Sequence, residues 1–362
     1  MRPILLAVAT SMTVSLVATP LVVRWFRLRG YGQSIREDGP QGHVTKSGTP
    51  TMGGIAMIAA GVIGYLVATL VYGPRYSPGG LLAIGTFALM GGVGFLDDAI
   101  KLKRRRNLGL TSRAKFIGQA LVAVLFALGA TYVAETSTTL SLIGPLEPLD
   151  FGPFFVVWCF LILAGTSNAV NLTDGLDGLA AGTSAMVFGA YTLIAYWILR
   201  HGSVETDAAG EIVPGSFDGL YTLEAWLHAD GLAVAGAAGL GACLGFLWWN
   251  APPAQVFMGD VGSLGLGGLM AALAVLTETE LLLVLIGGLF VVETISVMLQ
   301  VAMFRASGKR LFKMAPLHHH FELRGWRETT VIVRFWIIAG IVTSLGLGVF
   351  YADYLVRLGT AP

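Results

Sequence analysis

Long stretches without charged residues recur along the whole chain and constrain its fold more than any other feature. An α-helix needs about 20 consecutive apolar residues to cross a bilayer. Such stretches occupy residues 3–23, 51–73, 76–96, 116–134, 151–170, 179–199, 231–249, 261–277, 281–304 and 335–352. In the ninth of them, only Glu293 and Gln300 are strongly polar. We therefore expect an all-α integral membrane protein of about ten transmembrane helices, forming one domain over residues 1–362.

The positively charged residues predict the orientation of these helices. In membrane proteins, Lys and Arg concentrate in the cytoplasmic loops. If the N-terminus lies outside, the inner loops fall near residues 24–50, 97–115, 171–178, 250–260 and 305–334, which hold 19 of the 23 Lys and Arg residues. The longest outer segment, 201–230, has six acidic residues and no Lys or Arg. Both termini are therefore predicted to lie outside the cytoplasm.

Two adjacent carboxylates, Asp97 and Asp98, directly follow an uncharged stretch. Acids at the end of a membrane helix are costly and usually functional, and carboxylate oxygens are ligands that Mg²⁺ prefers. This placement predicts phosphoryl chemistry at a membrane surface. Lys101 and the basic tract 103–106 come next, and they are most simply topology signals that contact anionic lipid headgroups.

Three further inner loops carry polar side chains. These are Asn171, Asp174 and Asp177, then Asn250, Phe257 and Asp260, and finally the consecutive His318, His319 and His320. The loops at 168–178 and 250–260 contain no Lys or Arg, although they lie on the basic side. Acids and amides without cations suit a site that holds a divalent cation and a polar ligand. Simpler readings stay open: helix caps at the acids, an interfacial aromatic at Phe257 and a solvated histidine loop.

The polar motifs occur in order at residues 38–54, 97–101, 109–115, 168–178, 250–260 and 314–322. They include Asp97-Asp98-Ala-Ile-Lys101 and the run Ala-Pro-Leu-His-His-His-Phe-Glu that ends at Glu322. Together they resemble the polyprenyl-phosphate N-acetylhexosamine-1-phosphate transferase family. The histidine run is similar to the branch that handles a MurNAc-pentapeptide, whereas the GlcNAc-phosphate branch has spaced histidines there.

The resemblance implies a Mg²⁺-dependent enzyme of the bacterial inner membrane whose active site faces the cytoplasm. It would transfer phospho-MurNAc-pentapeptide from UDP-MurNAc-pentapeptide to undecaprenyl phosphate. The products would be undecaprenyl-pyrophosphoryl-MurNAc-pentapeptide (lipid I) and UMP, in the first membrane step of peptidoglycan synthesis. The alternative is a sister transferase that uses UDP-GlcNAc and polyprenyl phosphate.

The resemblance also assigns residues to roles. The implied catalytic residues are Asp97, Asp98, Lys115, Asp260 and His318. Asp260 would bind the metal ion, with Asp97 as a second ligand or close neighbour. Asp98 would orient or deprotonate the attacking lipid phosphate, and Lys115 and His318 would stabilise charge on the pyrophosphate. The implied substrate-binding residues are Lys46, Thr51, Asn171, Asp174, Asp177, Asn250, Phe257, His319 and His320.

Two other functional classes fit the sequence less well. A secondary transporter places acids near the membrane midplane, whereas here only Glu293, with Gln300 two turns on, is clearly intramembrane. We expect that pair to satisfy a kinked helix or a groove. A non-catalytic scaffold does not need carboxylates on one side only. Membrane lipid is an expected partner and nucleic acid is not, while the oligomeric state, a homodimer included, is left open by the sequence.

Overall fold

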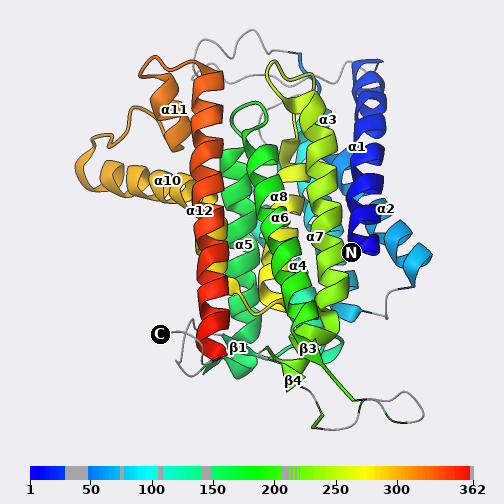
Figure 1. The fold of residues 1–362 in the computed structure, drawn as a ribbon. Coiled ribbons are helices and arrows are strands. Elements are labelled where there is room, and N and C mark those ends of the chain that lie inside the picture. Colours follow the sequence, from blue (N-terminus) through cyan, green and yellow to red (C-terminus); the bar gives the residue numbers. More distant parts are fainter. Residues whose placement is uncertain are drawn as a thin grey trace.

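The computed structural model describes residues 1–28, 48–73, 77–104, 109–140, 148–205, 207, 212, 215–216, 218–219 and 221–358. Within this part of the chain, ten helices are long and apolar enough to cross a membrane. They are α1 (Arg2–Leu28), α2 (Gly54–Tyr72), α3 (Pro78–Arg104), α4 (Ser112–Tyr132), α5 (Phe155–Thr173), α6 (Leu179–Arg200), α7 (Leu223–Asn250), α8 (Gly259–Leu276), α10 (Gly288–Ser307) and α12 (Glu328–Arg357). The predicted all-α membrane fold is confirmed (Figure 1).

Short elements complete the described chain. Helix α9 spans Glu280–Ile286, α11 spans Leu317–Glu322, and a 3-10 turn at Gly152–Phe154 leads into α5. Strand β1 (Thr139–Leu140) pairs antiparallel with β2 (Leu149–Asp150), and β3 (Gly202–Ser203) pairs in the same way with β4 (Asp218–Gly219). Figure 1 places both strand pairs at the end of the bundle opposite α11.

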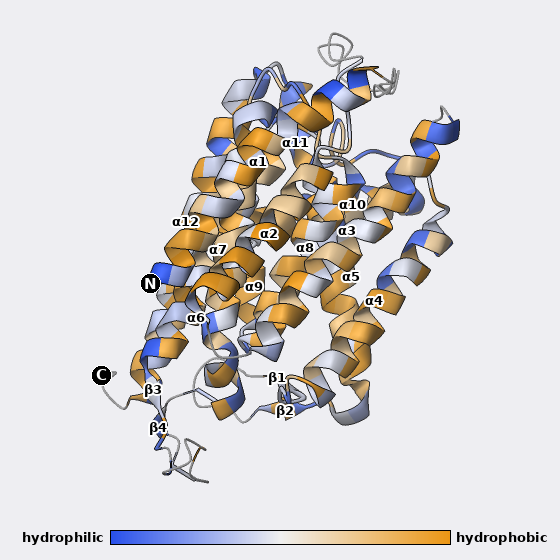
Figure 2. Cartoon of the chain, turned by 90° about the vertical axis from the view of Figure 1, so that its right-hand side faces the viewer, coloured by the Kyte–Doolittle hydropathy of each residue, from blue (hydrophilic) through white to orange (hydrophobic). Residues whose placement is uncertain are grey.

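Apolar residues cover the flanks of the bundle and polar ones its two ends, as Figure 2 shows. Helix α8 is its innermost element, because every residue from Val261 to Leu276 is buried. Helix α10 is the opposite case, with Met298 65% and Phe304 55% exposed. Apolar side chains left uncovered on a membrane protein face lipid tails. The bundle therefore has a protein-packed centre and a lipid-facing rim.

One predicted span is wrong in detail. The stretch 281–304 was expected to form one helix, but the structure ends α9 at Ile286 and starts α10 at Gly288. Two adjacent glycines weaken a helix at this point, and Thr343 of α12 donates a hydrogen bond of 2.9 Å to the carbonyl of Ile286. A backbone group freed at a helix break is thus satisfied inside the protein. Helix α10 then projects sideways from the bundle (Figure 1).

Candidate active site

Three carboxylates from two helices meet at one end of the bundle. Asp97 and Asp98 lie in the last two turns of α3, and Asp260 lies in the first turn of α8. Candidate ligand oxygens of the three residues all lie within 4.8 Å of one another. We call these residues the acidic centre. Close packing of the helices brings them together, since a Cβ on Gly94 of α3 would collide with the backbone carbonyl of Asp260.

Backbone groups hold both α3 carboxylates in place. Asp97 accepts a 2.7 Å hydrogen bond from the amide of Leu110, and Asp98 accepts one of 3.2 Å from the amide of Val261. Both side chains are only 3–4% exposed. Gly259 has φ +72°, and a Cβ there would lie 2.5 Å from Oδ2 of Asp98. A glycine at this position therefore lets the chain turn tightly against the carboxylate.

Two lysines neutralise the acidic centre. The Nζ of Lys101 lies 2.6 Å from Asp97, 3.1 Å from Asp98 and 3.2 Å from Asp260. Lys115 Nζ lies 2.8 Å from Oδ2 of Asp260. The family resemblance predicts Lys115 at the site, whereas Lys101 was predicted to be a topology signal. Lys101 follows the two α3 acids by three and four residues, a spacing that puts side chains on one helix face. This spacing was the signal in the sequence that could have placed Lys101 at the site.

Amide groups border the centre on the α5 side. Asn171 donates hydrogen bonds of 2.8 Å to Oδ1 of Asp260 and 2.9 Å to Oγ of Ser263. Asp174 follows the end of α5. Its pKa is raised well above 3.8, first because surrounding protein removes water from the carboxyl and then because Asp260 and Asp98 repel a further negative charge. Asn171 and Asp174 therefore belong to the same electrostatic environment as the acidic centre.

Asp177 and Asn250 connect the loop after α5 to the loop after α7. Asp177 accepts a 2.9 Å hydrogen bond from the amide of Ala254, and Asn250 accepts one of 3.0 Å from the amide of Gly178. Both side chains are buried. The structure thus gives them a bracing role between the loops, and the substrate contacts expected of them stay predictions.

Thr51 and Phe257 sit where another pair of segments meets. The amide of Phe257 donates to the carbonyl of Pro50 at 2.8 Å, and the amide of Gly53 donates to the carbonyl of Phe257 at 2.9 Å. This pairing fixes the chain just before Asp260, next to Thr51, whose side chain is buried. Lys46, which was expected near this place, lies outside the described residues.

The three consecutive histidines have three different surroundings. His318 is fully buried, and a Cβ on Gly175 would collide with its Nε2. His319 lies 2.7 Å from the carboxylate of Glu322 through Nδ1. His320 accepts a 3.1 Å hydrogen bond from the amide of Lys313, and its pKa is lowered first by desolvation and then by nearby cations. The run therefore meets the loop that carries Asp174 through its first two members.

Several polar residues that the sequence reading left without a site role support this region. Ser263 and Gln119 accept hydrogen bonds from Asn171 and Asn168 of α5. Glu293 and Gln300 bind the backbone around the histidines. The last two were visible as isolated polar residues in an apolar stretch. Gln119 and Ser263 gave no such signal, because amides and hydroxyls are common in membrane helices.

Fold and site together define a class of protein. A bundle of membrane helices carries, at one end, buried carboxylates and lysines that can bind a cation and phosphate oxygens. Such a site serves an enzyme that transfers a phosphorylated group next to the bilayer.

The comparisons with known proteins agree with this class. Residues 81–278 match the family described as glycosyl transferase family 4. The phospho-N-acetylmuramoyl-pentapeptide-transferase of Frankia alni is 51% identical over 98% of this chain and 99% of the relative. Relatives of the same name from Cutibacterium acnes and Mycobacterium tuberculosis are 50% and 48% identical, over 98% and 99% of this chain and 99% and 100% of their own lengths. The chain belongs to glycosyl transferase family 4 and is a phosphosugar transferase of the membrane.

Proposed function

We propose that this enzyme transfers phospho-MurNAc-pentapeptide from UDP-MurNAc-pentapeptide to undecaprenyl phosphate, giving lipid I and UMP. The observation that carries the proposal is the acidic centre, enclosed by Lys101 and Lys115 at the end of a membrane bundle. A lipid phosphate and a soluble nucleotide sugar can meet only at such an interface. The name shared by relatives of about 50% identity over nearly the full length supports the choice of substrate.

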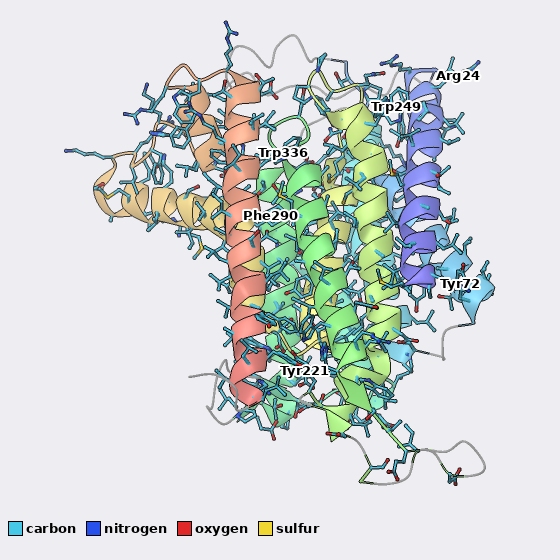
Figure 3. The ribbon with its side chains drawn as sticks, in the orientation of Figure 1. Arg24, Tyr72, Tyr221, Trp249, Phe290 and Trp336 are labelled. Carbon is cyan, nitrogen blue, oxygen red and sulfur yellow. The ribbon has the colours of Figure 1, made fainter. Side chains whose placement is uncertain are left out.

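The site faces the cytoplasm of a bacterium, with both termini outside. The uneven distribution of Lys and Arg between the two sides supports this orientation. In Figure 3, Arg24 lies at the end of α1, at the same end of the bundle as α11, and Tyr221 lies at the opposite end. Introducing Cys at Lys103 tests the orientation with a membrane-impermeant thiol reagent. Labelling only after the cells are opened supports it, and strong labelling in intact cells contradicts it.

Mg²⁺ is the cofactor that suits this site. The donors of the acidic centre are all carboxylate oxygens, which Mg²⁺ prefers, and both described cysteines are buried in membrane helices. Asp260 and Asp97 would hold the ion, which would neutralise negative charge on the pyrophosphate of the UDP-sugar. Lys115, whose ammonium group lies beside Asp260, would neutralise part of the same pyrophosphate charge.

The reaction joins an oxygen of undecaprenyl phosphate to the sugar-linked phosphorus of the UDP-sugar. The bond from that phosphorus to the bridging oxygen breaks, and UMP leaves with the bonding electrons. Asp98 is suited to orient the attacking phosphate or take its proton, because it is buried at the same cluster.

Purified enzyme with undecaprenyl phosphate and each UDP-sugar tests the proposal. UMP release is expected with UDP-MurNAc-pentapeptide and Mg²⁺, and not with UDP-GlcNAc. Turnover with UDP-GlcNAc instead would favour the sister activity. Full turnover in excess EDTA would exclude the cation.

A further inference from the structure

Glu293 is a buried acid that the proposed reaction does not use. It lies on α10, the helix that projects from the bundle, and its side chain is 0% exposed. A carboxylate buried without compensation destabilises a protein by several kcal/mol. Among the described residues, no Lys or Arg pairs with Glu293, so its partners must lie elsewhere.

Its partners are the backbone and the side chain of the histidine run. The Glu293 carboxylate accepts hydrogen bonds of 2.7 Å from the amide of Leu317 and 3.2 Å from the amide of His318. These two amides belong to the first two residues of α11. Pro316, which precedes the helix, provides no side-chain cap. The first amides of a helix need such an acceptor. Glu293 therefore supplies from another helix the cap that α11 lacks.

The same carboxylate faces the ring of His318. Its Oε1 lies 3.2 Å from Nδ1, although the direction is not that of a hydrogen bond, and both ring nitrogens are otherwise without a partner. A carboxylate this close to Nδ1 favours the ring orientation that keeps Nδ1 toward Glu293. The opposite nitrogen, Nε2, lies against Gly175, next to Asp174.

Gln300, two turns further along α10, also binds the backbone of the segment that precedes α11. It accepts hydrogen bonds from the amides of Leu311 at 3.0 Å and Phe312 at 2.8 Å. No contact joins it to His318 in the described structure. Glu293 and Gln300 thus attach the same segment at two points, and of these two residues only Glu293 reaches the histidine. Gln300 is therefore a matched control.

We propose that Glu293 is a positioning residue for His318. It fixes the first turn of α11 and holds the imidazole with Nδ1 toward the carboxylate, so that Nε2 is directed toward the loop that carries Asp174 and toward the pyrophosphate of the substrate. This inference rests on the proposed function, because it assumes that His318 acts on the pyrophosphate.

The kinetic test compares Glu293→Gln with Gln300→Ala. Gln at position 293 keeps an acceptor for the backbone but removes the charge facing His318. We expect kcat to fall about tenfold or more with KM for the UDP-sugar within about twofold, while Gln300→Ala changes kcat by about threefold at most. A Glu293→Gln variant with normal kcat would overturn the proposal.

A double-mutant cycle with His318→Ala separates positioning from general damage. If Glu293 acts through His318, Glu293→Gln on top of His318→Ala causes little further loss. Losses that multiply would show that Glu293 acts independently of the histidine.

Amide hydrogen exchange of peptides covering 311–322 provides a measurement that does not depend on turnover. We expect Glu293→Ala to speed exchange at Leu317 and His318, and Glu293→Gln to stay near the wild type. Unchanged exchange in Glu293→Ala would overturn the capping role. A wild-type enzyme that fails to use UDP-MurNAc-pentapeptide contradicts the proposed function alone, and the exchange result still reports on Glu293.

Discussion

The candidate site has two parts that are built differently. The acidic centre stands on α3 and α8, two long helices in close contact, and its carboxylates are held by backbone amides. The histidine segment, residues 311–322, is irregular in its first half and forms the six-residue α11 in its second. Hydrogen bonds to α10 hold it in place. Groups on rigid helices keep their geometry better than groups on loops. We infer that the acidic centre performs most of the chemistry. The histidine segment would contribute His318 to the pyrophosphate and, through His319 and His320, adapt the site to its sugar and peptide.

The sharpest test of this contrast is Asp260→Asn. The amide keeps the shape of the side chain but loses the charge that faces Lys101, Lys115 and a bound cation. We expect turnover to fall about a thousandfold or more, with the protein still inserted and folded. Asp97→Asn and Asp98→Asn are expected to have losses of the same order. Near-normal turnover of Asp260→Asn with unchanged Mg²⁺ dependence would move the cation elsewhere.

The second test concerns Lys101, which contacts all three carboxylates, against Lys115, which contacts only Asp260. An ammonium among the ligand oxygens competes with a divalent cation for them. Lys101→Met is therefore expected to bind Mn²⁺ about tenfold more tightly without substrate, measured by electron paramagnetic resonance. Turnover should still fall about a hundredfold, because a phosphate-binding charge is lost. Lys115→Met should change Mn²⁺ affinity less, and equal effects would refute the distinction.

The residues in these two tests also show how much of the site could be predicted from the sequence. Uncharged stretches identify membrane helices because bilayer burial depends on local composition, and the motif positions indicated Asp97, Asp98 and Asp260. The break at Gly287 and the place of Lys101 depend on tertiary contacts, with Thr343 and with α8 respectively. A single sequence carries no direct record of such contacts.

Helix ends show the same limit. Helix α7 was expected to begin near residue 231, yet it begins at Leu223. Thr222 caps it by accepting a 3.1 Å hydrogen bond from the amide of Ala225. The acids Glu224 and Asp230 hid this extension from a reading based on charge. A helix can continue past the apolar layer once its first amides have an acceptor.

The third test divides the histidine segment itself. His318 is buried against the loop that carries Asp174, whereas His320 lies beside Lys313 and Phe312. We expect His318→Ala to lose about a hundredfold in kcat, because the role proposed for its imidazole is to stabilise charge in the transition state. His320→Ala should mainly raise KM for the UDP-sugar, about threefold to tenfold. The reverse pattern would mean that the segment faces the substrate the other way round.

The smallest expected effect lies at Asp174, on the border between the two parts. Its pKa in the folded protein is raised above the ordinary 3.8, chiefly by desolvation and then by the carboxylates of Asp260 and Asp98. Above pH 3.8 the unfolded chain releases this proton while the folded protein retains it. Folding therefore becomes less favourable as the pH rises from 3.8 to the raised pKa, and it changes no further beyond it.

Asp174→Asn removes this penalty, because an amide does not ionise. In EDTA at pH 7, we expect the variant to melt on the order of 2 °C higher than the wild type, and the difference should disappear as the pH approaches 3.8. Turnover should nevertheless fall, since the family resemblance predicts that this carboxylate binds the substrate. Asn171→Ala is a suitable control, because it removes a neighbouring polar contact to Asp260 without removing a charge. If Asp174→Asn is no more stable than the wild type at pH 7, ionisation of the Asp174 carboxyl does not destabilise the folded protein. The predicted electrostatic link between Asp174 and the acidic centre would then be wrong.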